Sequence, residues 1–255
     1  MQVDLNADMG ESFGPWKMGD DAALLNTVTS ANIACGAHAG DPDVMATTMG
    51  IALEKGVGIG AHPGFDDIQG FGRRRIDMPL KSLQNSIRCQ VGSSLGMARA
   101  IGATVRHIKL HGALGNMTSE DEEMARGCFE AALSAHPDAI IMVLAATAQE
   151  RAARSLGVPF ACEIFADRAY NADATLVDRR KPGAVIHDAD LAGKRMVEMV
   201  KAQAIITEDG TRIGTPIDSI CCHGDTPEAV EIAANVRRML EAQGISVRAF
   251  DGRTG

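Results

Sequence analysis

Short apolar runs alternate with longer segments of helical periodicity from one end of this chain to the other. Strands that alternate with helices in this way form a parallel sheet with crossover helices. No linker, repeat or low-complexity tract divides the 255 residues. The pattern therefore predicts a single α/β domain over residues 1–255, a length that one β/α barrel commonly fills.

The apolar runs predict strands, and the segments between them predict helices. The strands are expected at residues 2–7, 28–35, 57–61, 104–110, 139–145, 159–165, 219–222 and 245–250. The helices are expected at residues 20–26, 42–55, 79–101, 120–135, 146–156, 189–204 and 227–243. Residues 205–217, with Asp209-Gly210 at their centre, instead predict a small hairpin.

Capping residues and glycines mark the predicted helix ends. Asp41 and Thr226 each precede a proline at the first helical position, and Ser119 with Glu122 makes a capping box. Glycines stand where helices should stop, at positions 56, 102, 157 and 244. This consistent punctuation supports the α/β prediction.

The formal net charge of -8 argues against nucleic acid or an anionic membrane as a partner, because the only basic runs are residues 73–75 and 179–181. No apolar segment approaches the length of a bilayer span, and the first residues lack the pattern of a signal peptide. We therefore expect a cytoplasmic protein. The six cysteines form no CxxC pair, so we expect buried thiols rather than disulfides.

Polar side chains follow nearly every predicted strand at its carboxyl end. In chain order they are Asn6, Asp8, Glu11, His38, His62, Lys109, His111, Glu163, Asp167, Arg168, His223 and Asp225. The carboxyl ends of parallel strands converge on one face, where ligands and catalytic groups gather. We therefore expect these side chains to share one cleft, which also explains why acids follow the buried first strand.

Some of these residues also have a purely structural interpretation. Asp225 precedes a predicted helix and could favour its dipole, and Asp167-Arg168 could be a plain surface pair. Gly58 and Gly60 lie within a strand, so they do not make a dinucleotide-binding loop. No role is assigned to the three histidines that lack the strand-end setting, His107, His136 and His187.

Two chemistries fit these residue types. Asp8, His38 and His62 could hold a divalent metal ion that activates water for hydrolysis. Without a metal, carboxylates and histidines could act as general acid and base on an amide. A loop with Arg73 to Arg75 could clamp a carboxylate or phosphate, or be a solvated turn.

The role of each residue follows from its chemical type. We expect Asp8 to act as base or to orient water, and His62 and His111 to act as acid or base. Lys109, Arg73 and Arg168 are expected to stabilise anions. The expected catalytic set is Asp8, His62, Lys109, His111 and Asp225. The expected substrate-binding set is Asn6, Glu11, His38, Arg73, Glu163, Asp167, Arg168 and His223.

Seven strings at the strand ends occur in one order and cover almost the whole chain. They are DLNADMGE (4–11), ANIACGAHAGD (31–41), GAHP (60–63), GFGRR (70–74), KLHGAL (109–114), EIFADRAY (163–170) and HGD (223–225). Together these strings resemble the LamB/YcsF family. The chain departs from the family at several positions, among them Ala174, where a glycine is usual.

The resemblance implies a distorted seven-stranded β/α barrel related to the glycoside hydrolase/deacetylase fold. It also implies ATP-dependent hydrolytic opening of 5-oxoproline to L-glutamate, in complex with two further subunits, B and C. ATP would be bound mainly by those partners, which agrees with the lack of a phosphate-binding loop here. A divalent metal ion and self-association are left open.

Three functions therefore stand as alternatives. The first is one component of a cyclic amide hydrolase, active only with its partners. The second is a stand-alone, metal-dependent, deacetylase-like hydrolase that uses Asp8, His38 and His62. The third is a non-catalytic subunit that presents substrate to its partners.

Overall fold

Seven parallel strands form a closed barrel in the computed structural model, which describes residues 1–224 and 228–254. The strands are β1 (Gln2–Met9), β2 (Ser30–Ala34), β3 (Gly58–His62), β4 (Val105–Lys109), β5 (Ile140–Leu144), β6 (Phe160–Phe165) and β9 (Ser219–Cys222). Each strand pairs with the next in this order, and β9 pairs with both β6 and β1. This closure confirms the predicted seven-stranded barrel.

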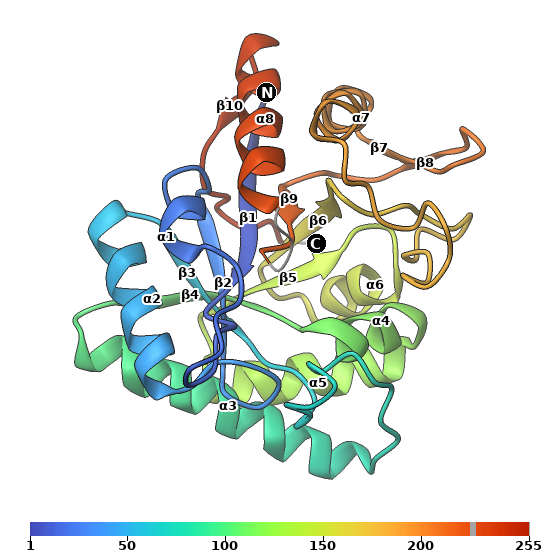
Figure 1. Cartoon of the computed structure of the whole chain (residues 1–255). Coiled ribbons are helices and arrows are strands. Elements are labelled where there is room, and N and C mark those ends of the chain that lie inside the picture. Colours follow the sequence, from blue (N-terminus) through green and yellow to red (C-terminus); the bar gives the residue numbers. More distant parts are fainter. Residues whose placement is uncertain (225–227, 255) are drawn as a thin grey trace.

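Helices surround the strands (Figure 1). They are α1 (Asp21–Leu24), α2 (Pro42–Lys55), α3 (Leu80–Ala100), α4 (Gly112–Glu120), α5 (Glu122–Ala135), α6 (Ala148–Leu156), α7 (Ala189–Ala202) and α8 (Ala229–Ala242). The predicted hairpin is confirmed as β7 (Ala204–Ile206) and β8 (Arg212–Gly214), which pair antiparallel. None of the helices in the described part of the chain combines the length and apolarity that crossing a membrane requires.

The helix boundaries confirm some predicted caps and contradict one. Asp41 accepts hydrogen bonds from the amides of Asp43 and Val44, as a capping residue does. The capping box of Ser119 and Glu122 is wrong, because Ser119 lies inside α4 and donates to the carbonyl of Asn116. Asp121 caps α5 instead. The predicted cap at residues 226–227 lies outside the described residues.

The last predicted strand is much shorter than the apolar run that predicts it. Only β10 (Ser246–Val247) pairs, with the first residues of β1. Beyond this strand, Phe250 packs with Met142 and Ala161 of two barrel strands. Residues 245–250 thus contribute both a short strand and an apolar side chain, Phe250, that packs against the barrel strands.

Polar side chains occupy much of the barrel interior. Neighbouring side chains of a strand point to opposite sides, so polar residues at alternate positions all face inward. Asp4, Asn6 and Asp8 alternate along β1 with apolar residues, and the register pairs Asn6 with Ser30 and Asp8 with Asn32. The other inward polar side chains are His62, His107, Lys109, Glu163, Ser219 and Cys221. The hydrophobic core therefore lies mainly between the strands and the helices.

The buried Asp4 carboxyl gives the first testable prediction. It accepts hydrogen bonds from Thr29 (2.6 Å), Ser30 (2.7 Å) and Ser219. Burial raises its pKa from 3.8 to about 6, against the lowering effect of the hydroxyls. A carboxyl with a raised folded-state pKa destabilises the fold as pH rises, from nothing below about pH 4 to the full cost above about pH 6.

We therefore expect Asp4→Asn to become more stable relative to the wild type as pH rises from 4 to 7. The relative free energy of unfolding, measured by urea denaturation, should rise by about 3 kcal/mol. Asp41→Asn should show the opposite sign, because amide hydrogen bonds lower the pKa of Asp41. Parallel stability curves for Asp4→Asn and the wild type would contradict the prediction.

Candidate active site

A cavity of about 750 Å³ opens where the barrel strands end. Its wall includes seven of the predicted residues: Asp8, His62, Arg73, Lys109, His111, Arg168 and His223. Five others are buried behind this wall: Asn6, Glu11, His38, Glu163 and Asp167. Asp225 lies outside the described residues. The strand-end prediction therefore describes one shared region of the fold.

A buried cation joins two carboxylates in the centre of the barrel. The Lys109 Nζ atom lies 2.9 Å from Asp8 Oδ1, 2.8 Å from Glu163 Oε1 and 3.1 Å from Cys221 Sγ. Asn6 donates a further hydrogen bond of 2.9 Å to Glu163 Oε1. Asp8 Oδ1 and Glu163 Oε1 thus each face the cation, as buried ions require, whereas Glu163 Oε2 has no hydrogen-bond partner among the described residues.

The same contacts set the protonation states. Burial alone would raise the pKa of Asp8, but His62 and Lys109 hold that pKa well below its usual value. Burial would lower the pKa of Lys109, but the carboxylate of Asp8 and the neighbouring Cys221 and Glu163 hold it well above. Asp8 and Lys109 are therefore ionised at neutral pH. Burial raises the pKa of Glu163 despite its contact with Lys109.

His62 and His111 share a proton next to Asp8. The Nδ1 atom of His62 lies 2.8 Å from the Lys109 carbonyl, and the Nε2 atom of His111 lies 2.9 Å from the Phe71 carbonyl. Carbonyl oxygens only accept, so both of these nitrogens carry protons. The remaining nitrogens, His62 Nε2 and His111 Nδ1, lie 3.0 Å apart, a separation that needs one proton between them.

His111 is the acceptor in this contact. Burial, His38 and His62 hold the pKa of His111 well below its usual value, so His111 is the neutral acceptor. The Nε2 atom of His62 also lies 3.3 Å from Asp8 Oδ2. His62 is thus in contact with an ionised carboxylate and a neutral histidine.

Glu11, His38, His62 and His111 come together within 4.8 Å and have the chemistry of a zinc site. His38 is buried and neither of its ring nitrogens has a hydrogen-bond partner in the structure, which suits a ligand. However, the His38 and His111 rings are stacked, with centroids 3.6 Å apart and planes within 5°. One ion about 2.1 Å from each nitrogen cannot lie in both ring planes.

These four residues, as arranged, do not fit a single metal ion. The set predicted from sequence, Asp8, His38 and His62, avoids the stacked pair and stays a prediction.

Asp167 and His223 form a second acid–base pair. The Nδ1 atom of His223 lies 2.8 Å and 2.9 Å from the two Asp167 oxygens. Burial would raise the pKa of Asp167, but His223 lowers it overall. His223 donates from Nδ1 to Asp167 and also lines the cavity. Asp167 therefore orients the ring, as carboxylates do in catalytic histidine pairs.

The surface-pair interpretation of Asp167-Arg168 is wrong, because both side chains are only 3% exposed. Arg168 donates to the carbonyls of Val177 and Ala184, which fix the guanidinium in the cavity wall. Burial, together with nearby Arg179, lowers the pKa of Arg168 to about 10, so it remains a cation at neutral pH.

The outer cavity is strongly cationic. Its lining includes eight cationic side chains but three carboxylates. The cations are Arg73, Arg74, Arg75, Lys109, Arg168, Arg179, Arg180 and Lys181. The carboxylates are those of Asp8, Glu120 and Asp178. Four of these cations are held by acids: Arg74 pairs with Asp67, Arg75 with Glu120, Arg180 with Asp178, and Lys109 with Asp8 and Glu163. The remaining positive charge favours an anionic ligand.

Sequence reasoning misses several residues of the site. Asn32 contacts Asp8 directly, Cys221 contacts Lys109, and residues 171–181 form one wall of the cavity. Within this wall Ala174 has a φ of 68°, a conformation that favours glycine, which agrees with the residue usual in the family. The alternation of polar residues along single strands is a signal that could have identified the inward positions.

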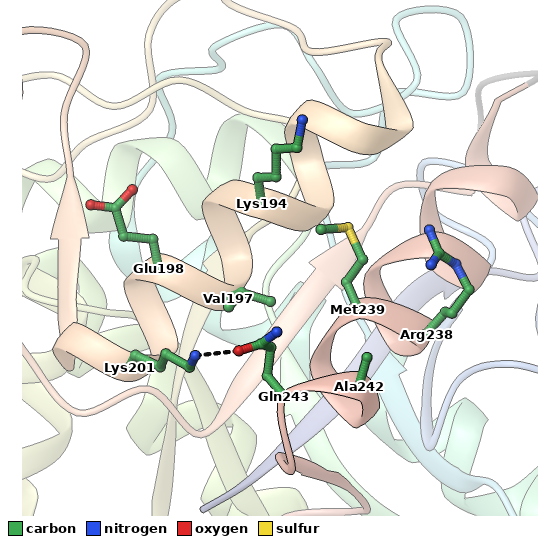
Figure 2. Close-up of a pocket in the computed structure, with 8 residues that line it drawn as sticks. All are labelled: Lys194, Val197, Glu198, Lys201, Arg238, Met239, Ala242 and Gln243. Carbon is green, nitrogen blue, oxygen red and sulfur yellow. Dashed lines mark hydrogen bonds between the residues drawn. The ribbon is translucent and has the colours of Figure 1, made fainter.

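A second hollow lies between α7 and α8 (Figure 2). Val197, Met239 and Ala242 give it an apolar floor, and Lys201 donates a hydrogen bond to Gln243 across it. None of its lining residues belongs to the cavity at the strand ends. It contains no histidine, so we place no acid–base chemistry there.

The closed parallel barrel and its cavity define a β/α-barrel protein with a candidate active site at the carboxyl ends of the strands. The chain belongs to the LamB/YcsF family, whose family model matches residues 3–255. It is 66% identical over 250 residues to the A subunit of the 5-oxoprolinase of Ruegeria pomeroyi, covering 98% of this chain and 99% of that protein.

Solved structures agree with this assignment. The chain superposes with a TM-score of 0.91 on a lactam utilization protein from Thermus thermophilus, at 38% identity, over 98% of this chain and 100% of that one. A family 4 carbohydrate esterase from Streptomyces lividans matches with a TM-score of 0.51 at 9% identity, covering 96% of this chain and 91% of that one. The latter likeness shows the fold alone.

The Lys109 network predicts a large effect on stability. Lys109→Met leaves the Asp8 and Glu163 carboxylates without their cation, so we expect unfolding in urea at pH 7 to become easier by about 3–5 kcal/mol. Glu163→Gln keeps an acceptor for Asn6 and Lys109 and should cost about 1 kcal/mol. The exposed Lys201→Met should change stability by less than about 0.5 kcal/mol. Equal stability of the two lysine variants would refute the role of the network.

Proposed function

We propose that this chain is the A subunit of a 5-oxoprolinase, which hydrolyses the cyclic amide of 5-oxoproline to L-glutamate. The observation that carries the proposal is the convergence of two histidine–carboxylate pairs, His62 with Asp8 and His223 with Asp167, on one cationic cavity. The substrate is a small carboxylate with an amide bond, which needs both acid–base groups and cations. The names of the 66% identical relative and of the lactam utilization protein support the same reaction.

The two pairs suit the two proton transfers of amide hydrolysis. His223, oriented by Asp167, accepts a proton from water as the water oxygen attacks the lactam carbonyl carbon. Protonated His62, held by Asp8, donates its proton to the ring nitrogen as the carbon–nitrogen bond breaks. Phe165 lies between the two regions, because Lys109 Nζ is 5.1 Å from its ring centroid and the His223 ring stacks on it at 5.2 Å.

The cations bind and stabilise negative charge in this scheme. Arg168 is fixed in the wall by two carbonyls and can pair with the substrate carboxylate in a defined position. Arg73, which stacks 4.7 Å from the Phe71 ring centroid, extends the same cationic surface. Because these arginines are in place before the substrate binds, they can also stabilise the negative charge that develops on the lactam oxygen.

ATP and two partner subunits, B and C, belong to the proposal. A five-membered lactam is a stable amide, so coupling its opening to ATP hydrolysis supplies driving force. The chain has no GxxxxGK[ST] loop, which supports a nucleotide site located mainly on the partners. The Ruegeria pomeroyi relative is itself named as one subunit of its enzyme, which supports an assembly of several chains.

The first experiment is a coupled assay of this chain with 5-oxoproline and ATP, with and without subunits B and C from the same source. We expect glutamate and ADP to appear together only in the full mixture. Glutamate formation by this chain alone, without ATP, would contradict the proposal and favour a stand-alone hydrolase. No glutamate in any mixture would also count against it.

Residue roles are tested in the same complex. Asp8→Asn and His223→Gln should each lower kcat by about 10²- to 10⁴-fold, because each removes one of the two proton-transfer groups or its partner. His187→Gln is the matched control, since this exposed histidine lies outside the cavity and should leave kcat unchanged. Full activity of both site variants would support the non-catalytic alternative instead.

A further inference from the structure

Four residues form a row across adjacent strands of the barrel. Asp8 of β1 pairs in register with Asn32 of β2, Asn32 pairs with Gly60 of β3, and Gly60 pairs with His107 of β4. Residues in register share a face of the sheet, so all four lie on the inner side. The row therefore links a catalytic carboxylate to a histidine three strands away.

Gly60 lets His107 reach Asn32. A Cβ atom at position 60 would collide with the His107 ring, so only glycine leaves room for the ring to cross β3. The Nε2 atom of His107 then lies 2.8 Å from Asn32 Oδ1. Gly60 thus provides the space, and His107 provides the ring nitrogen that contacts Asn32.

The contacts of Asn32 fix the orientation of its amide. Its Nδ2 atom lies 2.7 Å from Asn6 Oδ1 and 2.8 Å from Asp8 Oδ1, and both of these oxygens are acceptors. The opposite orientation would place Asn32 Oδ1 against the Asp8 carboxylate. Asn32 Oδ1 therefore faces His107 Nε2, which donates to it, so that His107 supports the same orientation from the other side.

This arrangement makes the two Asp8 oxygens different. Oδ1 is held by Asn32 and by Lys109 at 2.9 Å, whereas Oδ2 faces His62 at 3.3 Å. A carboxylate anchored through one oxygen presents the other in a fixed direction. The direction of the Oδ2 atom that faces His62 therefore depends in part on Asn32, which does not line the cavity.

We propose that Asn32 and His107 are positioning residues, which fix the Asp8 carboxylate so that its Oδ2 atom holds His62 in line with the reacting amide. The proposal rests on the proposed hydrolysis. It assigns a role to Asn32, His107 and Gly60 that the strand-end pattern does not identify. Burial, which lowers the pKa of His107 to about 3, agrees with a neutral ring that donates through Nε2.

The kinetic test uses variants of His107 in the assembled complex. His107→Phe keeps a flat aromatic ring but removes the donor, so kcat should fall about 10- to 100-fold while KM changes less than about 2-fold. His107→Gln places an amide donor near the Nε2 position and should restore most of the activity. Asn32→Ser, which shortens the donor, should resemble His107→Phe.

His136→Phe is the matched control, because the hydrogen bond that His136 makes among the described residues goes to the Val105 carbonyl, and His136 lies outside the cavity. We expect its kcat to equal that of the wild type, with circular dichroism showing that all variants are folded. Folded His107→Phe and Asn32→Ser with wild-type kcat would overturn the proposal. So would equal losses in His107→Phe and His107→Gln, because the donor would then be irrelevant.

A spectroscopic measurement separates this proposal from the proposed function. In protein labelled with ¹⁵N-histidine, His107 should be the neutral tautomer protonated at Nε2, and its signals should shift in Asn32→Ser. A His107 protonated at Nδ1 would overturn the positioning role even if the complex forms glutamate. The expected tautomer, in a complex without glutamate formation, would leave the hydrogen-bond row intact and count against the hydrolysis alone.

Discussion

The contact of Lys109 with Asp8 and Glu163 is the constraint on which the rest of the structure depends. These residues come from β4, β1 and β6, so their meeting requires the barrel to close in one register. A slip of one residue in any of these strands would turn a charge toward the apolar helices. Buried ion pairs add little net stability compared with apolar packing, but they penalise wrong arrangements strongly. The network therefore selects the register as well as the chemistry.

This constraint explains the division of the chain into two environments. The outer faces of the strands and the inner faces of the helices are aliphatic, since aromatic residues make up only 4% of the chain. The barrel interior instead has a polar layer that ends at the apolar plug of Phe250, Met142 and Ala161. A charged centre enclosed in an apolar shell has a low effective dielectric, so each proton and each cation acts strongly on its neighbours.

The strands and most helices could be predicted because periodicity and caps are local signals, and the strand-end rule needs only the order of the elements. Helix α4 could not, because its first residues look only like a strand end. The rest of the site depends on register. The contact of His107 with Asn32 crosses Gly60, and Asp167 pairs with His223 in space. Such contacts depend on the register between neighbouring strands. The register is set by the whole barrel, so local sequence patterns do not predict it.

The four strand-end histidines illustrate how folding assigns function to residues that look equivalent in sequence. His38 and His111 are stacked on each other, and burial holds the pKa of both well below the usual value, so they are neutral. His62 and His223 each have a carboxylate partner, Asp8 and Asp167. A histidine can transfer a proton efficiently near neutral pH only when its charged form is stabilised to some extent. The two carboxylates thus distinguish the two rings to which the proposed hydrolysis assigns the acid and base roles.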